Sequence, residues 1–384
     1  MAFDRLLNLT PLLAKKSFFL FGPRGTGKTH LIRKELSKTA FIIDLLQSEM
    51  NLRLSSNPSE LQNIVSQNAD KKRPIVIDEI QKIPALLDEV HRLIEEFGFR
   101  FLLTGSSARK LKRGAANLLG GRAWTTNLFP LCWKEIPHFN LERYLRFGGL
   151  PSVVQSEFPE EELQAYLQNY IKEEVQAEGL VRTLPAFSRF LKTAALSNGQ
   201  LINFANIGSD AGISASTIKS YYSILEDTLL GFSHEPWVES KKRKAIATAK
   251  FYLFDPGVTH VIAGTKTLDR NSDLFGHSFE QWIGMELRAF LGYNRIFDPL
   301  CFWRSTHQHE VDYVIGDHTA VEVKSTRKVQ SKHLRGLKAL QEERVFKHYY
   351  LVSEDRIAKR QDGISCLPWA EFLTKLWAGE IVQS

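Results

Sequence analysis

The stretch FFLFGPRGTGKTHLI, residues 18–32, decides the fold of the N-terminal part of this 384-residue chain. Its apolar run, Phe18–Phe21, predicts a buried β-strand. The polar half has the G-x-x-x-x-G-K-[ST] spacing of a phosphate-binding loop. Its fixed positions are Gly22, Gly27, Lys28 and Thr29. A helix is expected directly afterwards, at about 29–37, so the motif has the strand–loop–helix context that it needs.

The residue types in this loop indicate what it would bind. Glycines let the backbone N–H groups face a phosphate, and the N-terminus of the following helix attracts an anion. Lys28 would reach the β- and γ-phosphates, and the hydroxyl of Thr29 would bind Mg²⁺. We therefore expect ATP and Mg²⁺ as ligands. The residues expected to contact the nucleotide are Gly22, Pro23, Arg24, Gly25, Thr26, Gly27, Lys28, Thr29 and His30.

A second stretch, RPIVIDEIQKIP at residues 73–84, supports ATP hydrolysis. Its β-branched run, Ile75–Ile77, is typical of a central strand in a parallel sheet, and two acids follow it. We expect Asp78 to join the Mg²⁺ shell and Glu79 to act on the attacking water.

A third strand is expected in RFLLTGSSA, residues 100–108, which ends in small polar residues. Open α/β sheets bind ligands beyond the carboxyl ends of their strands. Thr104 or Ser106 would therefore sense the γ-phosphate, although turn chemistry alone accounts equally well for Ser106 and Ser107.

Two arginines beyond this strand are candidates for a contact between subunits. In ring-forming ATPases an arginine from a neighbouring subunit stabilises the transition-state charge on the γ-phosphate. Arg122, which follows two glycines, is favoured over Arg113. A plain surface arginine is the equally weighted alternative.

Taken together, the motifs resemble a known family. The phosphate-binding loop is followed, in order, by IDEIQ, LTGSSARKLKRG, LLGGRA, LFPL and FGGLP. This set is similar to an AAA+ type group of bacterial and archaeal ATPases. Members carry a C-terminal domain of uncharacterised function that itself resembles PD-(D/E)xK restriction-endonuclease folds. The resemblance covers about Leu6 to Lys338. It implies an α/β fold with an ATPase core at 1–140 and a helical lid at 141–195.

Charge and cysteine content bear on partner and compartment. The net charge is +7 and the pI about 9.1, with basic clusters at 71–73, 109–113 and 241–244. Such a balance favours a nucleic-acid partner, most simply DNA, while a soluble basic surface is the plainer alternative. No apolar run approaches the roughly 18 residues of a membrane span. Three widely spaced cysteines fit the reducing cytoplasm.

The middle of the chain is predicted to be helical. The stretch 159–176 has a proline start, acids in its first turn and an apolar stripe at helical spacing. Residues 196–240 follow a helix-turn-helix or winged-helix-like pattern. The apolar stripe of its second helix is Ile218, Tyr222, Leu225 and Leu229. Polar residues near the start of that helix are suited to DNA, namely Ser214, Ser216, Thr217, Lys219 and Ser220. A packing module is the alternative, and the sharpest linker candidate is 238–248.

The last segment, 241–384, contains HEVDYVIGDHTAVEVKS at residues 309–325. Two strands flanking the turn GDH would place Asp312 opposite Glu322, with Lys324 on the same face and Glu310 opposite it. Two facing carboxylates can share Mg²⁺ or Mn²⁺, and a lysine can stabilise a scissile phosphate. The opposite face is expected to hold Val311, Tyr313, Ile315, Val321 and Val323.

The D…E-x-K spacing matches the PD-(D/E)xK nucleases, which by resemblance also use an acid from a preceding helix. Glu280 is favoured for this role over Glu286, which lies on the apolar stripe of its helix. A solvated strand face is the alternative for the triad. Two functions follow. The first is an ATPase coupled to DNA binding or processing, with a metal-dependent nuclease site. The second is a nucleotide-dependent switch or interaction protein with an inactive nuclease-like fold.

Overall fold

The computed structural model describes the chain except residues 1–2, 69–72, 108–118, 177–180, 182 and 383–384. The candidate Arg113 and the basic cluster 109–113 lie outside the described residues. Contacts divide the chain into two compact units. The N-terminal unit comprises Met1–Leu131 and Ile224–Leu230, and the C-terminal unit comprises Cys132–Ser223 and Gly231–Ser384. The expected segments 141–195 and 241–384 therefore fall in one unit.

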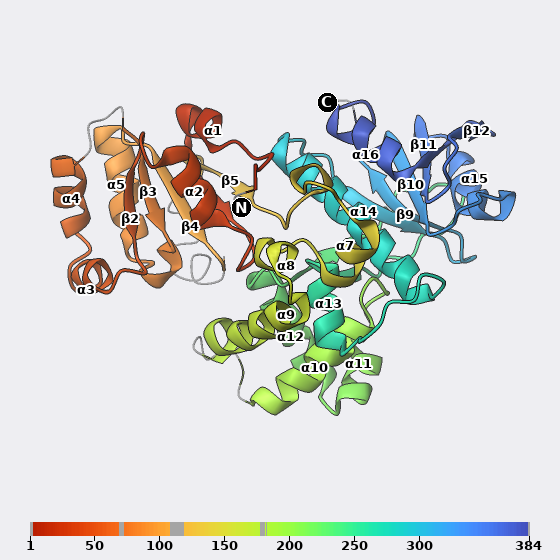
Figure 1. Ribbon diagram of the computed structural model, residues 1–384, viewed down its shortest axis with the longest axis horizontal. Helices are drawn as coiled ribbons and strands as arrows, with labels where there is room; N and C mark the ends of the chain where they lie inside the picture. Colours follow the sequence, from red (N-terminus) through yellow and green to blue (C-terminus); the bar gives the residue numbers. More distant parts are fainter. Residues whose placement is uncertain (1–2, 69–72, 108–118, 177–180, 182, 383–384) are drawn as a thin grey trace. The chain divides into compact units, whose positions relative to one another are not determined.

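The N-terminal unit contains a five-stranded sheet with the order β2-β3-β4-β1-β5, in which every neighbouring pair is parallel. Its strands are β1 (Ser17–Phe21), β2 (Phe41–Asp44), β3 (Ile75–Asp78), β4 (Phe101–Gly105) and β5 (Ala123–Asn127). Its helices are α1 (Leu9–Lys15), α2 (Lys28–Leu36), α3 (Ser48–Ser56), α4 (Glu60–Asn68) and α5 (Leu86–Phe97). The three predicted strands and the helix after the loop are confirmed (Figure 1).

Burial explains why these strands read as continuous apolar runs. Every residue of β3 and β4 is buried, as expected for a parallel sheet covered on both faces. Leu86, Val90 and Leu93 lie on the buried side of α5 and pack with Ile75 and Ile77 of β3. The carboxyl ends of the parallel strands thereby meet at one edge of a rigid sheet.

The C-terminal unit begins with helices. They are α7 (Leu141–Phe147), α8 (Pro151–Gln155), α9 (Pro159–Asn169), a π-helical stretch Tyr170–Gln176, α10 (Leu184–Leu196), α11 (Phe204–Ala211), α12 (Ala215–Asp227) and α13 (Pro256–Ala263). The last turn of α12, from Ile224, is counted with the N-terminal unit. In α12, Ile218, Tyr222 and Leu225 are buried as predicted. Leu229 is a correction, because the helix ends at Asp227 and Leu229 has a left-handed φ of 58°.

The motif FGGLP has a structural explanation in this helical part. The carboxylate of Asp255 caps α13 and also accepts the N–H of Gly149 at 2.7 Å. A Cβ on Gly148 would lie 1.9 Å from the Asp255 Oδ1 atom. Gly148 is therefore required by the close approach of a buried carboxylate, and its φ of 77° also favours glycine.

The C-terminal unit also contains a six-stranded mixed sheet with the order β12-β13-β11-β10-β9-β8. Its strands are β8 (Leu300–Arg304), β9 (Glu310–Ile315), β10 (Thr319–Lys324), β11 (His348–Ser353), β12 (Lys359–Gln361) and β13 (Ile364–Pro368). Strands β10, β11 and β13 are parallel, and the other pairs are antiparallel. A separate antiparallel pair joins β6 (Gly231–His234) and β7 (Lys250–Leu253).

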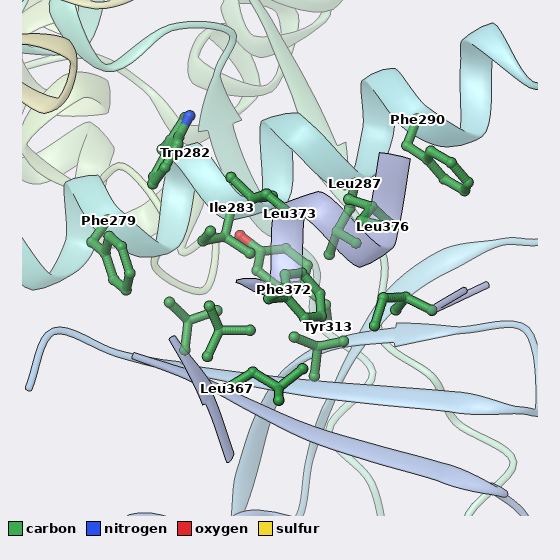
Figure 2. Packing of buried hydrophobic residues seen from close by; sticks show 14 of the residues in the cluster. Phe279, Trp282, Ile283, Leu287, Phe290, Tyr313, Leu367, Phe372, Leu373 and Leu376 are labelled. Atoms are coloured by element: carbon green, nitrogen blue, oxygen red, sulfur yellow. The ribbon is translucent and has the colours of Figure 1, made fainter. Parts of the chain in front are cut away.

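Helices cover both faces of this sheet. Figure 2 shows side chains of α14 (Asp273–Tyr293) and α16 (Trp369–Trp377), such as Ile283 and Phe372, packed with Tyr313 of the sheet. Residues of α15 (Arg335–Gln341) pack with Val314 and Ala320 in a second cluster.

The predicted face of the hairpin is mostly confirmed. Tyr313, Ile315, Val321 and Val323 pack in the α14–α16 cluster. Val311 was expected beside them but packs in the α15 cluster instead. The cause is an irregularity in the strands, because the β8–β9 register shifts between Cys301 and Trp303, opposite this part of β9.

The expected linker at 238–248 is anchored rather than free. The Glu343 carboxylate accepts N–H groups from three consecutive backbone positions, at 2.8, 2.9 and 3.2 Å. They belong to Lys241, Lys242 and Arg243. Arg243 also donates to the Ala339 carbonyl at 3.0 Å. None of the described helices is both long and apolar enough to cross a membrane.

Candidate functional sites

The phosphate-binding loop has the backbone conformation for which its glycines were expected. Gly25 and Gly27 have left-handed φ values of 79° and 92°, and α2 begins directly afterwards. Gly22 is required for another reason, since a Cβ there would lie 2.5 Å from the Leu128 carbonyl oxygen. The backbone of the LFPL motif, at Leu128, therefore lies directly against the loop.

Lys28 lies inside this loop. Its side chain is buried, and Nζ donates to the carbonyl oxygens of Gly22 at 2.7 Å and Pro23 at 3.2 Å. Both acceptors are neutral backbone carbonyls, and they fix the position of the ammonium inside the loop. The position therefore fits a contact with anionic phosphate.

Asp78 and Thr29, which were predicted to bind Mg²⁺, lie in direct contact. The Thr29 hydroxyl donates to Asp78 Oδ2 at 2.7 Å, and the Thr104 hydroxyl donates to Oδ1. Asp78 is 1% exposed. A carboxylate and a hydroxyl side by side form the hard-oxygen donor set that Mg²⁺ prefers, so these residues fit the ion.

Glu79 follows with a left-handed backbone at φ 65°, which is uncommon for a residue other than glycine. Its N–H donates to the Thr104 hydroxyl at 2.9 Å, and its carboxylate accepts from Gln81 Nε2. Gln81 Nε2 also donates to Ser106 Oγ at 3.2 Å. Sequence reasoning missed Gln81, for which proximity to Glu79 within IDEIQ was the available signal.

The other candidates of this unit have definite positions. Thr104 is fully buried, and its hydroxyl joins Asp78 to the Glu79 backbone. Arg122 forms a surface ion pair with Glu95 at 2.5 Å and is 37% exposed. Arg24, Gly25 and His30 are exposed, whereas Thr26 is buried.

Arg5 is a further residue that sequence reasoning missed. Its guanidinium donates to the Thr26 carbonyl at 2.7 Å and to the Phe129 carbonyl at 2.6 Å. It therefore ties the phosphate-binding loop to the segment after β5. No local motif surrounds Arg5, so only its basic character near the N-terminus marked it.

In the C-terminal unit, the predicted triad lies where β9 and β10 diverge. Their ladder ends with the pair Tyr313 and Val321. Beyond it, the Asp312 side chain accepts the N–H of Val323 at 2.8 Å. Lys324 Nζ lies 2.6 Å from Glu322 Oε1 and 3.5 Å from Asp312 Oδ2, so the structure brings the three together.

Glu280 reaches the same place from α14, whereas Glu286 does not. Tyr252 OH donates to Glu280 Oε1 at 2.5 Å. Burial, and then the charge of Asp312, raise the pKa of Glu280. Glu286 is instead held in the core by the backbone N–H of Trp133 at 2.6 Å and by Trp377 Nε1 at 2.8 Å.

Lys250 is the main residue of this site that sequence reasoning missed. It is 3% exposed, and its Nζ lies 2.5 Å from Glu310 and 3.5 Å from Glu280. Burial alone would lower the pKa of Lys250, but Glu280, Glu310 and Asp312 outweigh burial and raise it. Glu310 thus pairs with Lys250 and with Arg304, at 3.2 Å, rather than with Lys324 as its expected position implied. The only signal was a lysine next to an apolar run.

We refer to Glu280, Asp312, Glu322, Lys250 and Lys324 as the acidic cluster. Burial, and then the charge of Asp312, raise the pKa of Glu322. Its Oε2 atom is buried without a hydrogen-bond partner among the described residues. The described part of the chain contains no group of three or more His, Cys, Asp or Glu side chains placed to hold a metal ion. Mg²⁺ is commonly held by one or two carboxylates together with water and substrate phosphates, so Asp312 and Glu322 remain a fitting pair.

Most of the residues expected to contact DNA are at the surface, whereas Thr217 and Arg243 are half-buried. Ser214, Ser216, Lys219 and Ser220 are exposed around the start of α12, as are Lys241, Lys242 and Lys244 in the anchored loop. The Ser214 hydroxyl lies 2.8 Å from the Thr217 hydroxyl. These groups could meet phosphates without repacking the core.

Three family models match successive parts of the chain. Residues 14–137 match an AAA domain, residues 138–269 a domain of unknown function (DUF8612), and residues 275–372 another domain of unknown function (DUF4143). The parallel sheet and the AAA match confirm the predicted α/β core of AAA type. The chain also resembles an uncharacterised protein of Methanocaldococcus jannaschii, at 23% identity over 335 residues, which are 79% of this chain and 73% of that protein.

Two solved structures show weak likeness. One is the Aeropyrum pernix ORC1 protein in complex with DNA, at 14% identity and a TM-score of 0.28, covering 68% of this chain and 94% of that one. The other is Can2 from Sulfobacillus thermosulfidooxidans in complex with cyclic tetra-adenylate, at 9% identity and a TM-score of 0.22, covering 95% and 99%. Both TM-scores are too low to indicate a shared overall fold.

Proposed function

We propose that the N-terminal unit binds and hydrolyses ATP with Mg²⁺. The contact of Thr29 with Asp78, beside the buried Lys28, is the observation that carries the proposal. It joins the phosphate-binding loop to the end of β3, as an ATPase requires. The AAA match over residues 14–137 supports the same activity.

Each side chain has a role in this reaction. Thr29 and Asp78 would hold Mg²⁺, which supplies charge neutralisation at the phosphate oxygens when bound. Lys28 would contact the β- and γ-phosphates. Glu79 would orient the attacking water and take its proton at a carboxylate oxygen, while Gln81 and Thr104 hold Glu79 in place.

Arg122 would act in a homo-oligomer by contacting the nucleotide of a neighbouring subunit. Its pair with Glu95 is on the surface, where such pairs contribute little stability. Exchanging Glu95 for a phosphate therefore costs little. Arg122 also lies after the glycine pair of LLGGRA, which gives the chain freedom there.

Phosphate release by the full chain tests the ATPase proposal. Wild type should hydrolyse ATP with Mg²⁺ and stop when the metal is chelated, and Thr29→Ala should be much slower. Ser37→Ala is the matched control, because Ser37 is an exposed hydroxyl directly after α2. Hydrolysis that is insensitive to chelation and to Thr29→Ala would contradict the proposal.

DNA is the proposed partner of the C-terminal unit. The exposed start of α12 and the exposed lysines at 241–244 supply hydroxyl and ammonium groups suited to phosphates. Helices α11 and α12 with the β6–β7 pair support a winged-helix-like module, and α7 to α10 would serve as a lid of the ATPase. The three free cysteines support a cytoplasmic location.

A second candidate function is metal-dependent cleavage of DNA at the acidic cluster. The buried, unpartnered Glu322 Oε2 atom favours it, since an unsatisfied carboxylate oxygen is costly unless a cation or water meets it. Asp312 and Glu322 would hold Mg²⁺ or Mn²⁺, Glu280 would support them, and Lys324 would stabilise charge on the scissile phosphate. This arrangement also supports our interpretation of the six-stranded sheet as endonuclease-like.

The alternative is a nucleotide-dependent switch whose nuclease-like fold is inactive. Incubating the chain with labelled linear, branched and single-stranded DNA, with and without ATP, Mg²⁺ and Mn²⁺, separates the two. Cleavage that disappears in Asp312→Asn supports the nuclease. Asp298→Asn is the matched control, since Asp298 pairs only with His318 among the described residues. Absence of cleavage under every condition supports the switch.

A further inference from the structure

A large cavity lies in the C-terminal unit outside the acidic cluster. Its volume is about 1040 Å³, which is at the upper end of ligand pockets. Side chains from five separate segments line it. The segments are the start of α7, the stretch before α14, the loops after β10 and β11, and the junction of β13 with α16. We call it the edge cavity.

The edge cavity is built on the carboxyl ends of the parallel strands. Lys324 pairs with Ser353, and Ser353 pairs with Pro368, so the three strand ends form one row. The Glu354 N–H donates to the Thr326 carbonyl at 3.1 Å, which fixes the two following loops side by side. Parallel strands of α/β sheets bind ligands at this edge. Lys324, the last residue of β10, belongs to both the row and the acidic cluster.

The charged side chains that line the edge cavity differ in whether they have hydrogen-bond or ion-pair partners. Arg270 is held by Glu142 and lies 2.5 Å from Glu354. Asp355 accepts the Val329 N–H at 3.1 Å and lies 3.5 Å from Lys359. The three carboxylates of the lining therefore all have partners.

Two arginines differ from these groups. Arg327 and Arg356 line the cavity, are exposed, and make no ion pair with any described residue. Trp369 and the exposed Ile357 give the same cavity an apolar surface. Arginine and aromatic groups in one groove are the combination that binds nucleic-acid strands through phosphates and base faces.

We propose that the edge cavity binds a nucleic-acid strand beside the acidic cluster, with Arg327 and Arg356 contacting its phosphates. This inference rests on the proposed cleavage function, for which it supplies the substrate path. A strand along the edge would pass Lys324 and so reach Glu322 and Asp312. The contacts are to phosphates, so binding here is independent of base sequence.

The test is binding of a labelled single-stranded oligonucleotide of mixed sequence to the full chain, with EDTA present so that binding is measured without cleavage. The double variant R327A/R356A should bind about 10-fold more weakly at moderate salt. For this variant the slope of log K against log salt concentration should become less steep by about 1.4, because two phosphate contacts are lost at roughly 0.7 each. The variant R335A/R344A removes two other exposed arginines and should bind like wild type. Equal affinity of R327A/R356A and wild type, or equal loss in both double variants, would overturn the proposal.

Two further measurements keep the outcome clear. R327K/R356K retains the charge and should bind close to wild type, and thermal unfolding confirms that each variant folds. Failure of the cleavage proposal is seen separately, as wild type that binds through these arginines but cuts nothing with Mg²⁺ or Mn²⁺. The edge-cavity proposal fails if R327A/R356A binds and cleaves the oligonucleotide as well as wild type does.

Discussion

The phosphate-binding loop and the acidic cluster both hold charged groups in buried positions, but they satisfy them differently. Lys28 is held by backbone carbonyls and Asp78 by hydroxyls, all of them neutral. In the acidic cluster, carboxylates pair directly with the ammonium groups of Lys250 and Lys324. Neutral carbonyls and hydroxyls do not compensate a charge as an ion pair does. These contacts of the first site are therefore to neutral groups, whereas the acids of the second are compensated in part by its own lysines.

This contrast predicts different consequences of losing a lysine in each place. In the loop, Lys28→Ala should abolish ATP turnover, with a loss of at least about 100-fold, while the fold persists. Lys28 is the buried cation of the loop, whereas Arg24 in the same loop is exposed. Phosphate release is the measurement, and Lys38→Ala, an exposed lysine just after α2, is the control. Turnover within a few-fold of wild type would refute the assignment of Lys28.

Glu79→Gln sharpens the comparison within the ATPase site. ATP binding should persist, because it rests on the loop, and hydrolysis should slow by about 100-fold, because the proton acceptor is lost. Nucleotide binding by fluorescence and single-turnover hydrolysis measure the two effects. If hydrolysis is unchanged in Glu79→Gln while Asp78→Asn abolishes it, Glu79 has only a structural role.

In the acidic cluster the corresponding change should affect stability. Lys250→Met would leave the half-buried Glu280 without this cation and would remove one of the two cations of Glu310, which keeps Arg304. The expected loss in the free energy of unfolding is about 3 kcal/mol. Denaturant unfolding measures the loss. Adding Glu280→Gln and Glu310→Gln should restore part of it. If Lys250→Met alone is as stable as wild type, the lysine does not compensate the acids.

The anchored loop offers a smaller effect. Changing Lys241, Lys242 and Lys244 to glutamine should weaken DNA binding about 10-fold and equally for unrelated sequences. Arg243 is left in place, because it holds the loop to Ala339. Binding isotherms at several salt concentrations provide the measurement. Affinity that is independent of salt and of these lysines would exclude the loop as a DNA contact.

A further prediction concerns pH and Glu286, and it bears on stability and on neither site directly. Burial raises its pKa to about 7 from an ordinary 4.5. The folded state then binds a proton that the unfolded state has lost, so Glu286 should lower stability as pH rises from about 4.5 to 7, by at most about 1.4 kcal/mol per pH unit. Glu286→Gln should flatten this decline. An identical pH profile of unfolding in wild type and variant would contradict the buried acid.

The sequence predicted what local patterns encode. The strand, loop and helix of residues 18–36 follow from apolar runs and glycine spacing, and Asp312, Glu322 and Lys324 follow from alternation across one turn. Lys250 and Gln81 could not be predicted in the same way. Their partners depend on how distant strands and helices pack, and neither residue stands in a motif that encodes such contacts.

The same limit explains the errors in the hairpin and in α12. Val311 departs from simple alternation because an irregularity in the β8–β9 ladder displaces that part of β9. Leu229 fits the helical stripe, but the helix ends at Asp227 and the chain turns. Both deviations arise from backbone geometry that periodicity does not record.

The central claim is that one chain holds two chemistries, and metal binding to the nucleotide-free protein tests it most directly. Calorimetric titration with Mg²⁺ and Mn²⁺ should detect a site in wild type that is absent in Asp312→Asn and present in Lys28→Ala. Such a result would place a metal at the acidic cluster independently of the ATPase. If wild type and Asp312→Asn titrate identically, or if neither binds metal, the ATPase is the only chemistry in the chain.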